Sequence, residues 1–348
     1  MNDFPTAPED FDIAWVERVF AQPAGSLAAL EYRPVGTGQV CDSFRFICDW
    51  RAGDAPASFI AKCPSADATS RAGAAMFHLY DMEIGWYRDC APTAGVACPR
   101  PYYAAIADDE QHFALLIEDL APLRQGDQIA GGSATQVAAA LDAVAALHAW
   151  RPAGGDWASL RWAHRSAGSM VIRNAMPAAY PQFRERFAGL LDAQVLDLGQ
   201  ALVDRIDAYL DHEAPSECLR HGDLRLDNIL FDRSGRTARL LDWQTVAMGR
   251  AANDVAYLIG TSFSDPAERR ARERGLVEAY LARRAALGGA PDSEAFWRDY
   301  RRNAFAGMIM AINAANYVER TERGDRMFAA MAERPARMAL DLDSLALL

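Results

Sequence analysis

The chain has 348 residues, half of them hydrophobic, which is enough to bury one large core or two ordinary ones. Its net charge of −11 argues against a nucleic-acid binder, which would normally present a basic face. The six cysteines form no C-x-x-C pair, the start lacks the basic residues of a signal peptide, and no apolar run could span a bilayer. These features predict a cytoplasmic protein with reduced thiols.

The first 120 residues are dominated by short segments rich in aromatic and β-branched residues, which is typical of strands. Turn-forming residues separate these segments. The pattern predicts a mostly antiparallel sheet of about five strands with an inserted helix. The predicted elements are a helix at 10–21, strands at 30–35, 43–50 and 57–64, a helix at 72–89, and strands at 100–107 and 112–120.

After residue 120 the apolar residues recur every three or four positions, which indicates helices. The sequence predicts an α+β, two-lobed fold with a small antiparallel-sheet lobe at 1–117, a hinge at 118–122 and a large helical lobe at 123–348. Ligand sites favour the cleft between two such lobes. The predicted elements are helices at 133–150 with Thr135 as a candidate N-cap, at 181–193, 195–211, 254–260 and 305–318, and a small hairpin at 228–243.

One lysine stands out in the composition. Lys62 is the only lysine, and the other 35 basic residues are arginines. One interpretation is that arginine has replaced lysine at the other positions and that Lys62 remains without a specific role. The other is that its position requires a compact ammonium group, which the planar guanidinium fork of arginine does not supply.

The segment His221-Gly222-Asp223 begins a cluster of polar residues that leads into the predicted hairpin. Asn228 starts the first hairpin strand, and the second strand ends at Asp242, so the hairpin should bring these two residues together. A carboxylate and an amide oxygen are hard ligands that suit Mg²⁺, and Asp223 would stand nearby as an acceptor for a hydroxyl proton. Each residue alone could be an ordinary turn residue. The combination favours a catalytic site.

The motif H-G-D-L-R-L-D-N-I-L-F at 221–231, followed by L-L-D-W-Q at 240–244, resembles the catalytic core of kinase-like phosphotransferases of the aminoglycoside and choline kinase type. Gln244 favours the ecdysteroid-kinase-like group. The resemblance covers about residues 30–260 and implies a protein-kinase-like fold. It implies that Asp223 is the catalytic base or a carboxylate that orients the substrate, and that Asn228 and Asp242 hold Mg²⁺.

The same resemblance gives expected roles to further residues. Arg225 occupies a position near the γ-phosphate, although a surface salt bridge is an equal alternative. Lys62 would bind the α- and β-phosphates and pair with Glu83 of the following helix. Glu83 could instead be an exposed charge paired with Arg88. Asp227 has no assigned role.

The phosphate-covering loop is a weaker match than the catalytic core. Gly36 and Gly38 provide only part of a G-x-G-x-x-G pattern, because Cys41 replaces the third glycine, and an ordinary turn is nearly as good an interpretation. Ser43 matches a serine that is common at this place in the family. Its hydroxyl, with neighbouring N–H groups, could bind the terminal phosphates.

Strand alternation suggests a slot for the adenine base. Ile60 lies on the same strand face as Lys62, two residues away. Leu230 would form the opposite wall, and backbone groups near Glu118 and Leu120 would contact the base edge. Each of these residues could equally belong to the core.

Other residues have two interpretations that stay open. Asp254 could cap its helix, brace the catalytic loop, or do both, and His148 is favoured as a structural residue. Several aromatic residues could line the acceptor pocket or belong to the core, namely Trp157, Trp162, Tyr257 and Tyr317.

The sequence thus predicts an ATP-dependent, Mg²⁺-requiring phosphotransferase that moves the γ-phosphate to a hydroxyl group of a small molecule. One alternative is an aminoglycoside- or choline-type kinase with a cationic acceptor, and another is a nucleotide-binding pseudokinase. A protein kinase is disfavoured because the chain has no D-F-G motif and no A-P-E motif after the catalytic-core motif. We expect no nucleic acid, no membrane and no obligate protein partner.

Overall fold

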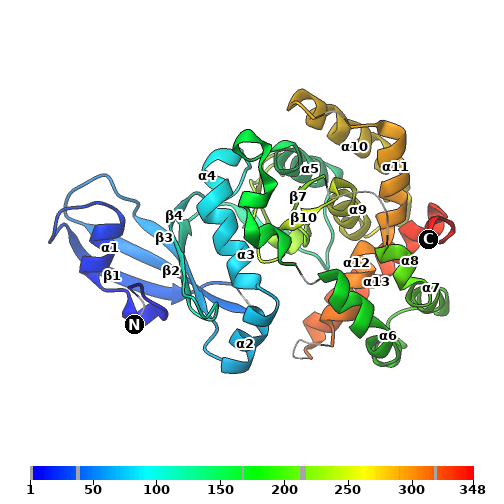
Figure 1. Cartoon of the computed structure of the whole chain (residues 1–348), viewed down its shortest axis with the longest axis horizontal. Helices are drawn as coiled ribbons and strands as arrows, with labels where there is room; N and C mark the ends of the chain where they lie inside the picture. Colours follow the sequence, from blue (N-terminus) through cyan, green and yellow to red (C-terminus); the bar gives the residue numbers. More distant parts are fainter. Residues whose placement is uncertain (1–2, 37–39, 167, 212–216, 290, 317–319) are drawn as a thin grey trace. The chain divides into compact units, whose positions relative to one another are not determined.

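The computed structural model describes residues 3–36, 40–166, 168–211, 217–289, 291–316 and 320–348. The chain forms two compact units (Figure 1). Unit 1 comprises Met1–Pro122, Pro152–Arg165 and Trp243–Val246, and unit 2 comprises Leu123–Arg151, Ser166–Asp242 and Ala247–Leu348. Two short segments from later in the chain therefore fold with the N-terminal part.

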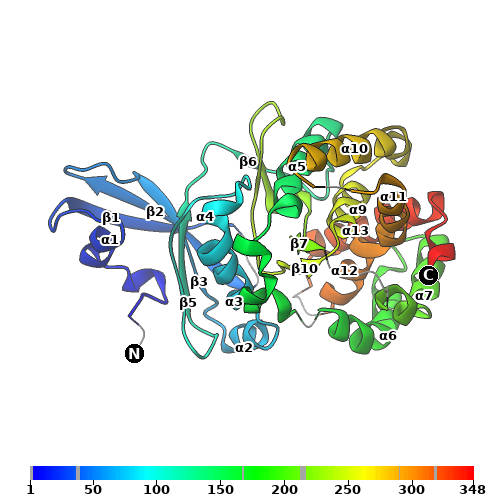
Figure 2. The ribbon, with the colours of Figure 1, turned by 45° about the horizontal axis from the view of Figure 1, so that its top comes forward.

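Unit 1 is built on a five-stranded antiparallel sheet with the strand order β1-β2-β3-β5-β4. Figure 2 shows this sheet with α1 beside it. The buried core on one face contains Phe11, Trp15 and Val16 from the α1 region together with strand residues such as Phe46 and Phe59. The strands are β1 Leu27–Pro34, β2 Cys41–Trp50, β3 Ser58–Pro64, β4 Pro101–Ile106 and β5 Phe113–Glu118, and α1 is Ile13–Val19.

The single helix predicted at 72–89 is wrong, because the structure divides this region into several pieces. Helix α2 spans Ala68–Met76, and α3 spans Leu79–Gly85. Between them His78 has a φ of 57°, in the left-handed region, which cannot continue a right-handed helix. A π-helical turn, Trp86–Cys90, and the short helix α4, Ala91–Ala94, follow α3. Apolar spacing predicted helical structure but not this break.

Unit 2 consists mainly of helices and contains two small sheets, β6-β8-β9 and β7-β10. The predicted hairpin is confirmed, because β8 pairs antiparallel with β9. The strands are β6 Arg124–Gln125, β7 Cys218–Arg220, β8 Ile229–Phe231, β9 Ala238–Leu240 and β10 Ala247–Gly249. The helices are α5 Ala134–Ala149, α6 Gly168–Phe187, α7 Ala193–Val203, α8 Ile206–Leu210, α9 Ala251–Ser262, α10 Pro266–Ala286, α11 Ser293–Arg302, α12 Ala306–Ala314 and α13 Glu322–Asp341.

Several predicted helix ends in unit 2 are wrong. Helix α6 begins at Gly168 and continues past Pro177 and Pro181, so its first half was missed, and it ends at Phe187 rather than 193. Asp192 caps α7, its carboxylate accepting the Val195 N–H. Helix α5 is capped by Ser133 and not by Thr135, because the Ser133 hydroxyl accepts the Gln136 N–H and the Gln136 side chain binds back in a capping box.

In the described part of the chain, no helix combines the length and hydropathy needed to cross a membrane.

Candidate functional site

In unit 1, the alternation of β3 places Lys62 on the sheet face opposite the α1 core. Phe59, Ala61 and Cys63 are buried in that core, so Ile60 and Lys62 point the other way. Lys62 is paired across the sheet with Ser43 on β2 and with Leu115 on β5. Ser43, Ile60 and Lys62 therefore share one face, as expected from their proposed roles in nucleotide binding.

The structure pairs Lys62 with Glu83 of α3 rather than leaving Glu83 as an exposed charge. The Lys62 Nζ lies 2.6 Å from Oε1 and 2.7 Å from Oε2 of Glu83. The two side chains are only 10% and 2% exposed. Arg88, the alternative partner for Glu83, contacts Asp89 instead. Removing one partner of such a buried pair leaves a poorly compensated charge and typically costs about 3–5 kcal/mol.

Glu83 and Trp86 both contact Trp243, the residue that follows Asp242. The Trp243 N–H donates to Glu83 Oε1 over 3.3 Å. The Trp243 ring stacks on Trp86, with centroids 3.9 Å apart and planes inclined by 13°. Trp86 lies in the π-helical turn, a feature that occurs often at functional sites. Sequence reasoning did not identify this stack.

The segment that the sequence predicts to cover the phosphates is only partly described. Gly36 has a φ of 76°, which favours glycine, and Gly38 lies outside the described residues. Cys41, which replaces the third glycine, is buried, and the Gln244 amide donates to its Sγ over 3.3 Å. Cys41 and Gln244 therefore connect the start of β2 to the Asp-Trp-Gln segment.

The connector after β5 contains an ion pair that sequence reasoning missed. The Arg45 guanidinium contacts both carboxylate oxygens of Asp119, at 2.9 and 2.8 Å, and the Ser58 hydroxyl also donates to Asp119. Burial opposes ionisation of Asp119, but these donors outweigh burial and lower its pKa. The pair fixes the residue between Glu118, which ends β5, and Leu120.

In unit 2, the backbone of the catalytic-loop motif is held by Asp254. Its carboxylate accepts the His221 N–H at 2.6 Å and the Gly222 N–H at 2.9 Å, and it lies 3.1 Å from His148 Nε2. Burial would raise the pKa of Asp254, but His148 and other donors lower it. Because α9 begins at Ala251, the N-cap interpretation of Asp254 is wrong. Asp254 braces the loop instead.

Gly222 has a φ of 86°, so the loop turns there through a conformation that side chains disfavour. The His221 ring lies 2.9 Å from the Leu241 carbonyl oxygen. The histidine-glycine pair thus shapes the loop and ties it to the end of the hairpin.

Asp223 follows this turn, and its carboxylate is surrounded by donors. Tyr257 of α9 donates its hydroxyl to Oδ1 at 2.6 Å, whereas Asn228 Nδ2 and Arg225 Nε donate to Oδ2 at 2.8 and 3.2 Å. Burial alone would raise the pKa of Asp223, but the Arg225 guanidinium and the Tyr257 hydroxyl lower it. Asp223 is therefore an anion, able to accept a hydrogen bond from a hydroxyl group.

Arg225 lies between two carboxylates. Besides Asp223, its Nη1 contacts Asp227 Oδ2 at 3.0 Å. Burial would lower the pKa of Arg225, and the charge of Asp223 outweighs burial and raises it. Asp227, for which the sequence suggested no role, also accepts the Gln128 N–H, which joins the loop to the chain before α5.

Asn228 and Asp242 have side-chain oxygens of the type that a magnesium ion prefers. Asn228 uses its amide nitrogen to bind the Asp223 carbonyl and carboxylate, so its side-chain oxygen is available as a ligand. The Leu241 N–H donates to the Asn228 carbonyl, which brings the end of the hairpin to Asn228. Asp242 comes next and has a φ of 62°, a strained backbone that often accompanies function. Among the described residues, no group of three or more histidine, cysteine, aspartate or glutamate side chains could hold a metal ion.

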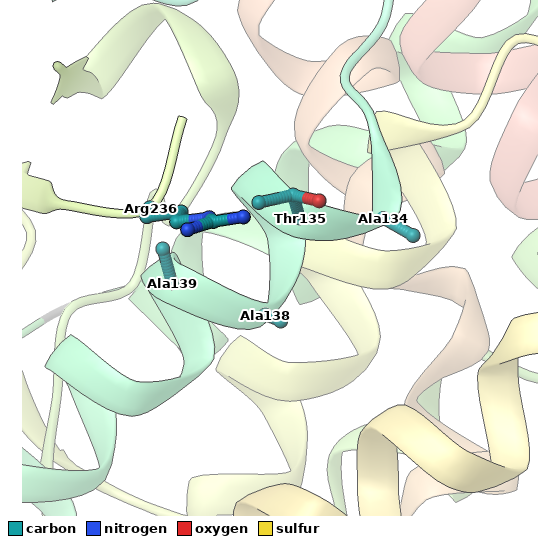
Figure 3. Close-up of a pocket in the computed structure, with 5 residues that line it drawn as sticks. All are labelled: Ala134, Thr135, Ala138, Ala139 and Arg236. Atoms are coloured by element: carbon teal, nitrogen blue, oxygen red, sulfur yellow. The ribbon is translucent and has the colours of Figure 1, made fainter. Parts of the chain in front are cut away.

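Two open hollows on the surface of unit 2 lie away from Asp223 and Asn228. One is a shallow, largely apolar depression on α5, where the Arg236 guanidinium lies beside Thr135 (Figure 3). A second lies along α13 and includes Arg326 and Arg334. Neither is lined by Asp223 or Asn228. The candidate site is therefore the loop that contains Asp223, Arg225 and Asn228.

Tyr257 was considered from the sequence only as one of several aromatic residues. It lies three residues after Asp254, so both side chains share a face of α9 and both contact residues 221–223. This three-residue spacing is the feature of the sequence from which the contact of Tyr257 with the loop could have been predicted. Of the other aromatic candidates, Trp162 packs in unit 1, donating to Asp89, and Tyr317 lies outside the described residues.

Leu230, the proposed wall of the adenine slot, lies in the middle of β8. It pairs with Arg239 of β9 and with Gln125 of β6. Its side chain is partly exposed, whereas the neighbouring Ile229 and Phe231 are buried. This exposure is compatible with contact to a ligand.

Several solved structures share this fold. An ethanolamine kinase of Plasmodium vivax is 12% identical, covers 92% of this chain and 87% of its own, and has a TM-score of 0.56. Aminoglycoside 2'-phosphotransferase-IIIa, solved as a GDP complex, is 15% identical, with 92% and 96% covered and a TM-score of 0.55. The ADP-bound aminoglycoside phosphotransferase APH(2'')-Ib is 16% identical, with 94% and 99% covered and a TM-score of 0.50. These similarities confirm the predicted α+β, kinase-like fold.

At the level of sequence, 61 residues are 36% identical to acyl-CoA dehydrogenase family member 11 of Rattus norvegicus. This match covers 16% of the chain and only 8% of the length of that relative. A model of the phosphotransferase enzyme family matches residues 50–297, which is more than half of the chain. The chain belongs to the phosphotransferase enzyme family.

Proposed function

We propose that this phosphotransferase moves the γ-phosphate of ATP to a hydroxyl group of a small molecule, with Mg²⁺ as cofactor. The observation that carries the proposal is the contact of Asn228 with Asp223. One amide group binds both the carbonyl and the carboxylate of Asp223. A candidate base and a candidate metal ligand are thereby fixed relative to each other, as transfer between an acceptor and a metal-bound nucleotide requires.

Lys62 serves in this proposal as the phosphate-binding cation. Its ammonium group is oriented by both oxygens of Glu83 and lies on the same sheet face as Ser43 and Ile60. Ser43 contributes a hydroxyl group towards the phosphates, and Ile60 contacts the base together with Leu230 and the backbone near Glu118 and Leu120. Gly36 and Gly38 belong to the loop that covers the phosphates.

Asn228 and Asp242 hold the magnesium ion, through the Asn228 side-chain oxygen and the Asp242 carboxylate. When bound, Mg²⁺ neutralises charge on the nucleotide phosphates. Asp223 accepts the hydrogen bond of the acceptor hydroxyl and aligns its oxygen for in-line attack. Arg225 keeps Asp223 ionised and adds positive charge near the transferred phosphoryl group.

The acceptor is proposed to be a small hydroxylated metabolite, and the Asp-Trp-Gln sequence at 242–244 favours the ecdysteroid-kinase-like group. A catalytically silent, nucleotide-binding protein is disfavoured, because Lys62, Glu83, Asp223 and Asn228 all keep partners suited to catalysis.

The experiment that tests the proposal combines a binding measurement with an activity measurement. Thermal unfolding is followed with ATP and Mg²⁺, and again with excess EDTA. ADP release is then screened against sterols, aminoglycosides, macrolides, sugars and choline. We expect ATP to raise the melting temperature only when Mg²⁺ is present, and at least one acceptor to stimulate ADP release.

The Asp223→Asn variant tests the role of the carboxylate, because this substitution removes the charge and keeps the size of the side chain. It should bind Mg²⁺-ATP and lose turnover by a factor of about 10³ or more. Turnover near that of the unchanged protein would contradict the role proposed for Asp223.

A further inference from the structure

The three protein donors to Asp223 divide unevenly between its two oxygens. Asn228 and Arg225 both donate to Oδ2, at 2.8 and 3.2 Å. Tyr257 donates to Oδ1, at 2.6 Å. Since a carboxylate oxygen accepts about two hydrogen bonds, the described donors fill Oδ2 and leave one accepting position on Oδ1.

Tyr257 is well suited to hold its position. Tyr257 is only 2% exposed, so water cannot readily replace the carboxylate as its partner. The ring projects from α9, the same helix that carries Asp254, and Asp254 holds the backbone of His221 and Gly222. One face of α9 therefore fixes both the backbone of the loop and the carboxylate of Asp223.

We propose that Tyr257 is a positioning residue that directs the acceptor hydroxyl to Oδ1 of Asp223, beside the tyrosine hydroxyl. The inference rests on the proposed function and adds to it the place at which the acceptor binds. With Oδ2 occupied, an incoming hydroxyl reaches the carboxylate at Oδ1. Tyr257 keeps the carboxylate plane from rotating and lines the acceptor site with its hydroxyl oxygen.

The transfer step balances without consuming Tyr257. The acceptor oxygen forms a bond to the γ-phosphorus while the bond from that phosphorus to the β,γ-bridging oxygen breaks, and ADP leaves with the electron pair. The acceptor proton moves to Oδ1 of Asp223 and then to solvent. Burial raises the pKa of Tyr257 well above its usual value, so Tyr257 retains its own proton and remains a donor throughout.

The test compares two tyrosine-to-phenylalanine variants of the full-length protein. Tyr257→Phe removes the hydroxyl and keeps the ring. Tyr300→Phe is the matched control, because Tyr300 is also buried and donates to a carboxylate, that of Glu273, at 2.8 Å. The measurements are kcat and KM for ATP and for the acceptor found by the screen, ATP affinity by calorimetry, and the melting temperature.

We expect Tyr257→Phe to lower kcat by about tenfold to a hundredfold, the effect of losing one hydrogen bond to a charged group. The KM for ATP and the ATP affinity should stay within about twofold. Tyr300→Phe should change the melting temperature while leaving kcat and both KM values within about twofold.

Two kinetic results would overturn the inference. One is a Tyr257→Phe variant with kcat within twofold of the unchanged protein, and the other is a variant that loses ATP affinity in proportion to kcat. A crystal structure in which Tyr257 does not contact Asp223 would also overturn it. If Asp223→Asn remains active, the proposed function fails first, so the two failures can be told apart.

Discussion

Gly85 and Gly73 are both helical glycines in unit 1, yet their replacement by alanine should change stability in opposite directions. A Cβ on Gly85 would lie 2.5 Å from two atoms of the Trp162 ring and 2.6 Å from a third. Trp162 is 3% exposed, and its Nε1 donates to Asp89 at 2.9 Å, so the ring cannot move away without losing contacts. At Gly73, in α2, no atom lies within 4 Å of the added Cβ.

The magnitudes follow from overpacking and helix propensity. Forcing a methyl group into packed space costs about 1–3 kcal/mol, and loss of the Trp162 hydrogen bond adds about 1 kcal/mol. Alanine recovers about 1 kcal/mol relative to glycine in a helix. Gly85→Ala should therefore destabilise the protein by about 2 kcal/mol. Gly73→Ala should stabilise it by up to about 1 kcal/mol.

Denaturant unfolding of both variants measures these differences, and ATP binding measures their effect on the site. Gly85 lies two residues after Glu83 on α3. A displacement of this helix should therefore disturb the Glu83 contact with Lys62 and weaken ATP binding in Gly85→Ala but not in Gly73→Ala. A Gly85→Ala variant as stable as the unchanged protein would refute the reasoning about Trp162.

Two other predictions concern buried charges. Lys62→Arg keeps the charge but should lower kcat/KM for ATP by at least about tenfold, and a fully active variant would contradict the interpretation of the single lysine. Asp254→Asn should destabilise the protein at pH 7 by about 3 kcal/mol, because the amide cannot replace an anion that accepts the N–H groups of His221 and Gly222. Because the pKa of Asp254 is lowered in the folded protein, its stabilisation is complete above the unfolded pKa of about 4 and is lost as the pH falls through the folded pKa. The gap in melting temperature between the unchanged protein and Asp254→Asn should therefore be wide at pH 7 and narrow below about pH 4, and a constant gap would contradict the lowered pKa.

The five strands of unit 1 and the hairpin of unit 2 could be predicted because alternating apolar residues and turn residues mark them locally. The break between α2 and α3 could not be predicted from the sequence. It depends on a left-handed histidine, His78, whose ring lies 2.8 Å from Glu110, thirty-two positions later in the chain. No local pattern encodes such a contact.

In the candidate site, too, the features encoded locally could be predicted and those that depend on distant contacts could not. The residue types and spacings of Asp223, Asn228 and Asp242 were visible in the sequence because they lie within one loop and hairpin. The contacts of Tyr257 and Asp254 with that loop depend on how α9 packs, and the sequence alone left open whether Asp254 caps its helix or braces the loop. Asp254 lies in the first turn of α9 but points to a different backbone, that of the catalytic loop.

The surroundings of Lys62 explain why one lysine stands among 35 arginines. Its ammonium group contacts both oxygens of Glu83 at 2.6 and 2.7 Å, in a place where the lysine side chain is only 10% exposed. A point charge with three donors can bind a carboxylate from one side and still present a donor to a phosphate. A guanidinium group is larger and planar, and pairing its fork with Glu83 would direct the remaining N–H groups elsewhere. Arginine and lysine are both solvated on an exposed surface and can replace each other there, but we expect the buried contact with Glu83 to require lysine.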